Sequence, residues 1–502
     1  MRLGAGYILA AAVLAVALPC SAGTVRVGLG SDPDILDPAI GGSYDGRVVF
    51  AALCDKLVDI DASLQFVPQL ATEWSWGEDA RSLTLKLRQG VVFHDGEAFD
   101  AAAVKANIER YKTMPESKRK AELALVSGVE VIDPATVKLQ LSRAYAPLVA
   151  VLSDRAGMMV SPKAAAAAGP QAGERLVCSG PYRFTERVAQ DRIVVDRFDR
   201  YWNAKPYTID RMVYLAIPDS NVRLANLRAG QLEIAEQIAP TDLPEARKDA
   251  RIRVVEGPSI AYNTFSFNLN HGERANTPFG RDRRVREAFE LAIDRTVINE
   301  VVFNGAYIPN NQPQAPGTEY YVKELPMPAR DLARAKALLA EAGSPRVALT
   351  LGMPNQPVAL AVAQVIQSMA AEAGFEIKIE AVEASTLTTE SEKGNYQATF
   401  GIWSGRADPD GNVSIWLACN GFLNWGKYCD PKLDELLGKA QATPVSAERY
   451  GFYRDAARIY LADRPHMILY HLKWFWGVST KVEGFKPHPD GLIRLTDMVL
   501  RP

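Results

Sequence analysis

The chain has 502 residues, of which 48% are hydrophobic and 23% are charged. At roughly 100–200 residues per domain, this length predicts two or three domains and excludes a single small binding module. Lys and Arg number 57 against 59 Asp and Glu, so the net charge of −2 gives no overall field that would favour nucleic acid or anionic lipid as a partner. The short basic runs at 118–120 and 281–286 are interpreted as solvated helix faces.

The N-terminus has the pattern of an export signal. Arg2 and the free amine form a weakly positive start, residues 7–18 are apolar, and small residues follow at 21–23. An apolar stretch of that length is too short to span the ~30 Å hydrocarbon core of a membrane, and no later segment reaches ~20 apolar residues. We therefore expect residues 1–22 to be a cleaved signal peptide and the mature protein to be exported. Cys20 allows a lipidated start, but the residues before it match that pattern poorly.

The first 260 residues are expected to mix strands and helices. Residues 24–29 read as a strand that ends in a Gly and Pro loop, and 83–87 alternate with the period of a strand. A turn at 94–96 precedes a helix that opens at Asp100. Further strands are expected around a helix at 221–228, at 182–184, 193–196, 212–217 and 252–255.

A regular alternation of elements follows residue 261. A strand at 262–269 leads to a long helix predicted over 285–303, and a second helix is predicted over 332–342. The chain then reads as strand, helix, strand, helix and strand, at 347–351, 358–373, 375–379, 385–393 and 397–403. This β-α-β-α-β order predicts a parallel sheet.

The loop at 404–412 is a candidate ligand site, because ligands gather beyond the carboxyl ends of strands in open parallel sheets. This loop is rich in polar and charged residues, although the strand that it directly follows is expected to be buried. Trp403 ends that strand, so we expect its ring to face the loop and form an apolar wall.

Enzyme and metal motifs are not assembled in this sequence. It has no Walker loop, no Gly-x-Ser-x-Gly elbow, no His-Glu-x-x-His and no Cys-x-x-Cys. His466 and His471 have a spacing that places them on opposite faces of a strand, so structural histidines are favoured over ligands. Asp408, Asp410 and Asn412 have a weak likeness to a calcium loop that lacks the required Gly and Glu. No cofactor is expected.

If the signal is removed near Ala22, four cysteines remain in an oxidising compartment. Cys419 and Cys429 bracket a turn-rich loop and are expected to form a disulfide. Cys54 and Cys178 are expected either to pair or to remain as buried thiols.

Several ordered segments resemble the extracellular solute-binding proteins of family 5, the dipeptide-, oligopeptide- and nickel-binding components of ABC importers. The matching segments are 36–38 (LDP), 71–74 (ATEW), 83–96 (LTLKLRQGVVFHDG), 180–182 (GPY), 201–202 (YW), 286–288 (REA) with 292–295 (AIDR), Trp403 with 408–409 (DP), 429–434 (CDPKLD) and 465–470 (PHMILY). They cover nearly the whole mature length.

The resemblance implies an α/β periplasmic binding protein fold of two hinge-linked lobes with an extra inserted domain. It implies a discontinuous lobe I at 23–44, 178–262 and 474–502, an inserted domain at 45–177, and lobe II at 263–473. It also implies a monomer that takes up a small solute and passes it to a membrane permease, without catalysis.

The ligand contacts implied by the resemblance lie in two loops. Ser43 and Tyr44 match the ligand loop of the first lobe, and Trp403, Arg406 and Asp408 lie in the segment that lines the cleft. Members that bind dipeptides carry an acid where this chain has Arg406, and that acid pairs with the peptide amine. Arg406 is therefore expected either to bind a carboxylate or phosphate of the ligand or to pair internally with Asp408 or Asp410.

The leading hypothesis is a receptor for a peptide or peptide-like solute. A receptor for an anionic conjugate of the opine or sugar type, or for a nickel or other metal chelate, is the alternative. A secreted hydrolase with a dispersed site is a remote one.

Overall fold

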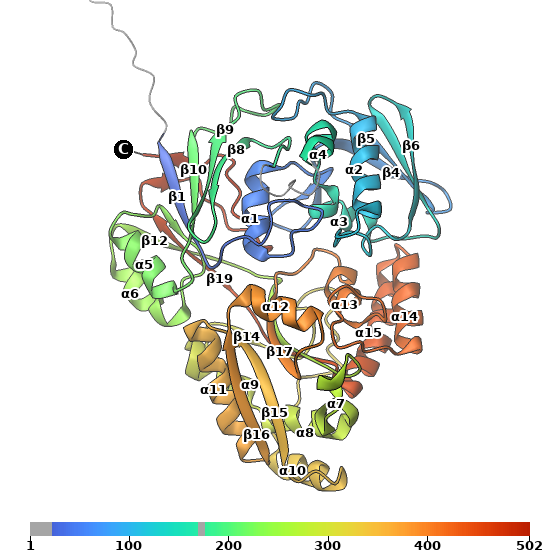
Figure 1. The fold of residues 1–502 in the computed structure, drawn as a ribbon, viewed down its shortest axis with the longest axis vertical. Coiled ribbons are helices and arrows are strands. Elements are labelled where there is room, and N and C mark those ends of the chain that lie inside the picture. Colours follow the sequence, from blue (N-terminus) through green and yellow to red (C-terminus); the bar gives the residue numbers. More distant parts are fainter. Residues whose placement is uncertain (1–22, 169–175, 502) are drawn as a thin grey trace, which may run out of the picture.

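The computed structural model describes residues 23–168 and 176–501, so the expected signal peptide and Cys20 lie outside the described residues. Two mixed α/β lobes lie one above the other in Figure 1, and a third unit stands beside the upper lobe. In the part of the chain that the structure describes, none of the helices combines the length and apolar character needed to cross a membrane.

Lobe I is built on a seven-stranded sheet with the order β12-β19-β11-β1-β10-β9-β8. Its central strand β1 (Thr24–Leu29) runs parallel to β10 (Arg211–Ala216) and to β11 (Ile234–Ala235). The other strands are β8 (Tyr182–Val188), β9 (Arg192–Arg197), β12 (Ile252–Gly257) and β19 (Trp474–Ser479), and the main helices are α1 (Tyr44–Leu53), α5 (Ser220–Arg228) and α6 (Leu243–Lys248). Because α1 contacts β8 and packs into the core of this lobe, lobe I extends past the boundary expected at residue 45. Residues that follow β1 and β11 therefore emerge at one edge of this sheet.

The third unit is an antiparallel sheet with its own apolar core. Its strands are β4 (Ala71–Trp76), β5 (Ser82–Leu87), β7 (Thr136–Leu141) and β6 (Val126–Asp133), in that order, and α2 (Ala101–Thr113) lies against β6 and β7. A disulfide between Cys54 and Cys178 joins the points where the chain leaves lobe I for this unit and returns from it. Of the two expectations for these cysteines, the disulfide is confirmed and the pair of buried thiols is wrong.

Lobe II contains a six-stranded sheet in the order β14-β18-β13-β17-β15-β16. β15 (Val347–Pro354) runs parallel to both β16 (Phe375–Val382) and β17 (Ala398–Trp403), which confirms the parallel β-α-β-α-β unit. Its connecting helices are α11 (Pro357–Ala371) and α12 (Ala384–Glu392). The other main elements are β13 (Tyr262–Phe267), β14 (Ile308–Pro309), β18 (His466–His471), α10 (Leu332–Glu341), α13 (Asp410–Leu417), α14 (Pro431–Ala442) and α15 (Ser446–Asp463).

The single helix predicted over 285–303 is wrong. Two helices occupy this segment, α8 (Arg283–Ala292) and α9 (Arg295–Phe303). Asp294 separates them because its carboxylate accepts hydrogen bonds from the backbone N–H groups of Thr296 and Val297, at 2.8 and 3.1 Å. This side chain starts a new helix by satisfying two amides that have no partner within it.

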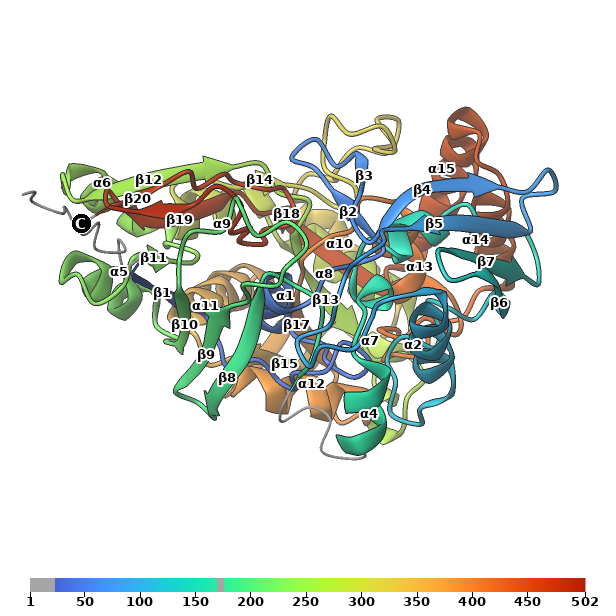
Figure 2. The same cartoon turned by 90° about the horizontal axis from the view of Figure 1, so that it is seen from above.

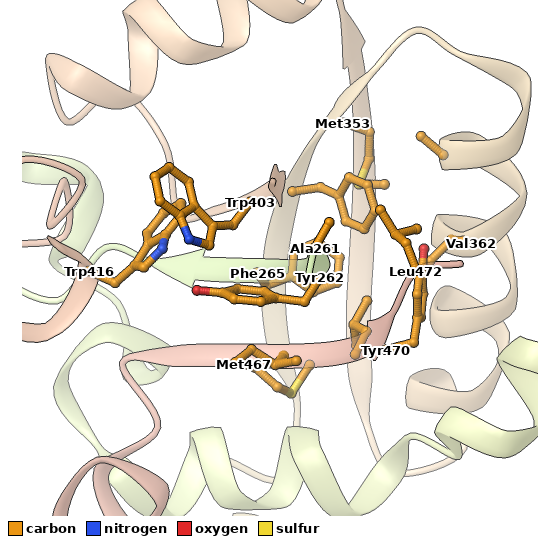
Figure 3. Close-up of a cluster of buried hydrophobic side chains, with 14 of the residues drawn as sticks. Ala261, Tyr262, Phe265, Met353, Val362, Trp403, Trp416, Met467, Tyr470 and Leu472 are labelled. Carbon is orange, nitrogen blue, oxygen red and sulfur yellow. The ribbon is translucent and has the colours of Figure 1, made fainter. Parts of the chain in front are cut away.

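The lobes are joined by two short crossings that lie side by side. The chain passes from β12 to β13 at 258–261 and from β18 to β19 at 472–473, and Leu472 N donates to Ala261 O at 3.0 Å. Figure 3 shows both residues within the buried cluster, beside the side chains of Tyr262 and Tyr470. One residue of each crossing, Ala261 and Leu472, is therefore part of the apolar core, which ties the two crossings together.

The third unit also contacts lobe II directly. In Figures 1 and 2 it lies next to α13, α14 and α15. Ala146 N donates to Gln441 O at 2.8 Å, and the Arg143 guanidinium donates to the Gln441 side chain at 2.7 Å. The two lobes are thus bridged on one side by the crossings and on the other by the third unit.

Candidate functional site between the lobes

The loop after β17 is held in one conformation by Asn412. Its Oδ1 accepts hydrogen bonds from Trp403 Nε1 at 2.9 Å and from Arg406 N at 2.8 Å, and its Nδ2 donates to Arg406 O at 2.9 Å. Gly405 has a φ of +78°, and a Cβ at this position would lie 2.4 Å from the Ile260 carbonyl oxygen. Only glycine fits here, and the tight turn fixes the backbone of Arg406.

Arg406 reaches across to the third unit. Its guanidinium lies over the ring of Trp403, 4.2 Å from the centroid, and its Nε is 2.7 Å from Asp154 Oδ2. Its acidic partner is therefore Asp154, not Asp408 or Asp410 as one expectation had it. A residue of lobe II is thus ion-paired with one of the third unit.

Asp154 is shared with a second arginine, from lobe I. Arg47 on α1 donates from Nε to Asp154 Oδ1 at 3.1 Å and from Nη1 to Ser404 Oγ at 2.8 Å. Burial opposes ionisation of Asp154, but the charges of Arg406 and Arg47 outweigh it and hold the pKa of this carboxyl well below its usual value. Asp154 therefore stays ionised and links all three parts of the molecule.

Two further arginines complete what we call the arginine cluster: Arg47, Arg119, Arg155 and Arg406, with Asp154 and Glu122 as their acidic partners. Arg119 is 0% exposed and donates to Glu122 at 2.8 Å, and Arg155 is 2% exposed and donates to Gly41 O at 3.0 Å. The cluster carries two more positive than negative charges. Burial, together with the positive charge of Arg119, lowers the pKa of Arg155 to about 10.

Several guanidinium nitrogens of the cluster are buried without a hydrogen-bond partner among the described residues. They are Nε and Nη2 of Arg119, Nε of Arg155 and Nη2 of Arg406. Burial lowers the pKa of Arg406 to about 9, although Asp154 acts in the opposite direction. Unpaired buried charge of this kind is energetically costly, so an anion placed here would be stabilised strongly.

Trp403 and Arg406 are the two expected contacts that the structure brings together. The Trp403 ring meets Trp416 edge to face at a centroid distance of 5.9 Å. In Figure 3 these two rings lie at one end of the buried cluster, with the hydroxyl of Tyr262 directed toward them. The aromatic group forms an apolar floor under the Arg406 side chain.

The other three expected contacts already have protein partners. Ser43 caps α1 by accepting from Gly46 N at 3.1 Å. The Tyr44 hydroxyl donates to Gly491 O at 2.8 Å. Both oxygens of Asp408 accept from Arg449, at 2.7 and 2.8 Å, so this acid is not paired with Arg406. As ligand contacts, all five residues remain predictions.

The interpretation of the basic runs as solvated helix faces is wrong for two residues. Arg119 is fully buried in a turn, and Arg286 on α8 is 6% exposed and donates to carbonyl oxygens, including Asp463 O at 2.7 Å. Arg119 was missed because a run of three basic residues gives no sign of which one points inward. Arg155 and Asp154 were missed because nothing in their local sequence indicates charge burial.

The histidines of β18 have structural partners. His466 shares hydrogen bonds with Thr264 and Ser266, and His471 with the Gln312 carbonyl oxygen at 3.0 Å. Cys419 and Cys429 form the expected disulfide. Within the described ranges no three His, Cys, Asp or Glu side chains gather in a way that suits a metal ion.

A more open hollow of about 520 Å³ lies elsewhere between the lobes. It is lined by the start of α5 and residues 239–241 on one side and by α9 and α11 on the other. None of its lining residues belongs to the arginine cluster or to the five expected contacts.

Residues 65–424 match the family model described as "Bacterial extracellular solute-binding proteins, family 5 Middle". The chain belongs to this family. It is 30% identical over 486 residues to the glutathione-binding protein GsiB of Pectobacterium atrosepticum, covering 94% of this chain and 93% of the relative. It is 29% identical over 527 residues to the probable di/tripeptide-binding protein 5 of Pseudomonas aeruginosa, covering 98% of each.

Solved structures of two-lobed binding proteins superpose on this family 5 chain. The periplasmic binding protein AgaA from A. tumefaciens R10, in complex with agropinic acid, has a TM-score of 0.87 and 25% identity, covering 96% of this chain and 99% of its own. The dipeptide-binding protein of Pseudoalteromonas sp. SM9913 in complex with Met-Leu has a TM-score of 0.87 and 22% identity, covering 95% and 100%. The two-lobed fold expected from the sequence is confirmed, and the protein is a solute-binding protein.

Proposed function

We propose that this protein is the periplasmic receptor of an ABC importer for a peptide-like solute that carries a net negative charge, unlike a neutral dipeptide such as Met-Leu. The ligand lies between the lobes, and hinge closure surrounds it before transfer to the permease. The observation that carries the proposal is the arginine cluster, in which three buried guanidinium groups and the largely buried one of Arg406, from three parts of the fold, face only two carboxylates.

Arg406 is the residue that directs specificity in this proposal. It stands after Trp403-Ser404-Gly405, and a cation at this point repels a peptide amine and attracts a carboxylate. Trp403 supplies an apolar wall, and Ser43 and Tyr44 supply hydrogen bonds from lobe I. Asp408 acts indirectly, by fixing Arg449 behind the loop.

The names of similar proteins are consistent with an acidic ligand. Glutathione, named for GsiB of Pectobacterium atrosepticum, is a tripeptide with two carboxylates. Agropinic acid, present in the AgaA structure, is itself an acid. A conjugate of the opine type is therefore the second candidate, and the same cluster would bind its acidic group.

Thermal unfolding of the mature chain against defined compounds tests the proposal. The panel contains glutathione, Ala-Glu, Met-Leu, agropinic acid and a nickel–histidine complex, and a ligand at 100 times its Kd stabilises by about 2.7 kcal/mol. We expect acidic compounds to raise the unfolding midpoint and Met-Leu to have little effect. Stabilisation by Met-Leu alone, or by the nickel complex alone, would refute the acidic-ligand proposal.

Arg406→Ala gives the matching test of the site. A charged hydrogen bond is worth about 1.5–3 kcal/mol, so affinity for the acidic compound should fall about ten-fold to a hundred-fold. Arg346→Ala is the control, because the Arg346 side chain is 83% exposed and lies in lobe II away from the cluster. Equal affinities of the two variants would exclude Arg406 as a ligand contact.

The remaining parts of the proposal concern the protein in the cell. We expect export through residues 1–22, a monomer in solution, and release of the ligand chemically unchanged. Cell fractionation, light scattering and mass spectrometry of the recovered ligand test these three statements. Turnover of the bound compound would support the hydrolase alternative.

A further inference from the structure

A pair of buried acids lies at the edge of lobe I, behind Tyr44. Glu236 directly follows β11, and its backbone N donates to Gly28 O of β1 at 3.0 Å. Asp45 lies in the first turn of α1, and Oδ2 of this residue accepts from Ser31 Oγ at 2.5 Å. Both therefore emerge where the parallel strands of lobe I end, which is the edge at which this kind of sheet binds ligands.

The acid pair has no cationic partner among the described residues. Glu236 is 1% exposed and Asp45 is 8% exposed. Neither oxygen of the Glu236 carboxylate accepts a hydrogen bond, and nor does Asp45 Oδ1. Burying one carboxylate without a partner is unfavourable, and burying two together adds their mutual repulsion.

The nearest cation does not satisfy these acids. The guanidinium of Arg223 on α5 donates hydrogen bonds to the backbone carbonyl oxygens of residues 217, 218, 236 and 237, at 2.6 to 3.2 Å. The Tyr44 hydroxyl gives its single proton to Gly491 O. Asp490, the next acid along this edge, is already paired with Arg494 at 2.9 Å. The groups around the pair are thus committed elsewhere.

The acid pair and the arginine cluster are neighbours. Asp45 and Arg47 lie two residues apart on α1, and Arg47 belongs to the cluster. Burial raises the pKa of Asp490, but the charge of Arg494 and, more weakly, that of Arg47 outweigh it and lower this pKa. Burial and Glu236 raise the pKa of Tyr44, with smaller contributions from Asp45 and Asp490. The acid pair and the arginine cluster are therefore both attached to the first turn of α1.

We propose that Asp45 and Glu236 bind a cationic group of the ligand, an ammonium, while its acidic group meets the arginine cluster. This inference rests on the proposed function and deepens it, since it specifies an amphoteric ligand. An ammonium has three N–H donors, which suits three carboxylate oxygens without partners. The aromatic stack of Tyr44 on Trp474, with centroids 5.4 Å apart, shields the pair from water on one side.

The orientation of the ligand follows from this charge arrangement. The cationic end contacts lobe I and the acidic end contacts Arg406 of lobe II. Both groups of charge must then be present on one molecule for full affinity.

Calorimetric titration with matched pairs of compounds tests the inference. Each pair contains the free amine and its N-acetyl form, which keeps every carboxylate: glutathione with N-acetyl-glutathione, and Ala-Glu with N-acetyl-Ala-Glu. We expect the wild type to bind the free amine of one pair at least ten-fold more tightly. Glu236→Gln and Asp45→Asn should each reduce that ratio toward one. The control Glu245→Gln, whose side chain is 63% exposed on α6, should preserve it.

The outcomes separate this inference from the proposed function. Binding that depends on Arg406 but is equal for the amine and its acetylated form would overturn the inference and leave the acidic-ligand receptor standing. An unchanged ratio in both Glu236→Gln and Asp45→Asn would also overturn it. If no acidic compound of the panel binds, the proposed function fails and the inference fails with it.

Discussion

Replacing Asp154 by Asn should destabilise the protein markedly. Asp154 accepts from Arg47 at 3.1 Å and lies 2.7 Å from Nε of Arg406; Arg47 is buried, and the Arg406 side chain is 12% exposed. After the change, Glu122 is the one acid left to the four arginines of the cluster. Removing one partner of a buried ion pair costs about 3–5 kcal/mol.

This free energy corresponds to a measurable shift of the unfolding midpoint. At ~2.1 cal/mol/K per residue, a chain of 502 residues has an unfolding entropy of about 1 kcal/mol/K, so a loss of ~4 kcal/mol lowers the midpoint by about 4 °C if the whole chain unfolds together. A larger shift is expected if a smaller unit unfolds first, because its entropy is smaller.

Differential scanning calorimetry of wild type, Asp154→Asn and the control Asp191→Asn measures the effect. The Asp191 side chain is 50% exposed and pairs with Arg192 at the surface, so its loss should cost less than about 1 kcal/mol. A ligand with a carboxylate should recover part of the midpoint of Asp154→Asn. Equal midpoints for Asp154→Asn and Asp191→Asn would refute the argument that Asp154 is the central acid of the cluster.

Three further outcomes follow from single residues. Asp294→Ala removes the cap of α9 and should lower the free energy of unfolding by about 1 kcal/mol, with faster amide exchange in α9. Burial, with the charge of Asp45, raises the pKa of Glu236 from 4.5 to about 8. The free energy of unfolding should therefore fall as the pH rises from about 4.5 to about 8, because the folded protein then loses a proton that it binds more tightly than the unfolded chain. Thermal unfolding from pH 5 to 9 should show a smaller fall in midpoint for Glu236→Gln than for the wild type. Gly405→Ala places a Cβ 2.4 Å from the Ile260 carbonyl oxygen and should lower both the midpoint and the affinity for an acidic ligand, measured by scanning and titration calorimetry.

Local patterns in the sequence predicted much of the fold. The alternating elements after residue 347 gave the parallel unit, because hydrophobic period and turn residues act within a few positions. The predicted helix over 285–303 failed at Asp294, where one capping side chain outweighed an apolar periodicity that continues through the break. Asp294, a good helix-capping residue, was the sequence signal for the break between the two helices, but the continuous apolar periodicity around it made it easy to overlook.

The candidate site was predictable only in part. Trp403 ends a strand and Arg406 lies in the loop after it, so position indicated this segment, and the family resemblance indicated Arg406. Asp154, the partner of Arg406, and Arg47, which shares Asp154 with it, lie in other parts of the fold, and Arg119 looked like any surface cation. Residues this far apart in the sequence meet only in the folded protein, so the spacing of residues along the chain does not predict which of them pair.

The disulfide between Cys54 and Cys178 has a consequence for how this molecule is assembled from modules. The two Cα atoms are 4.9 Å apart although 124 positions separate them in sequence. Consecutive Cα atoms are about 3.8 Å apart, so a linker of one or two residues would span the gap. The intervening segment is therefore a cassette that a lineage is able to gain, lose or exchange while the host sheet keeps its course. Because Asp154, Arg155 and Arg119 reside on this cassette, exchanging it would replace half of the cationic groups at the cleft in one genetic event.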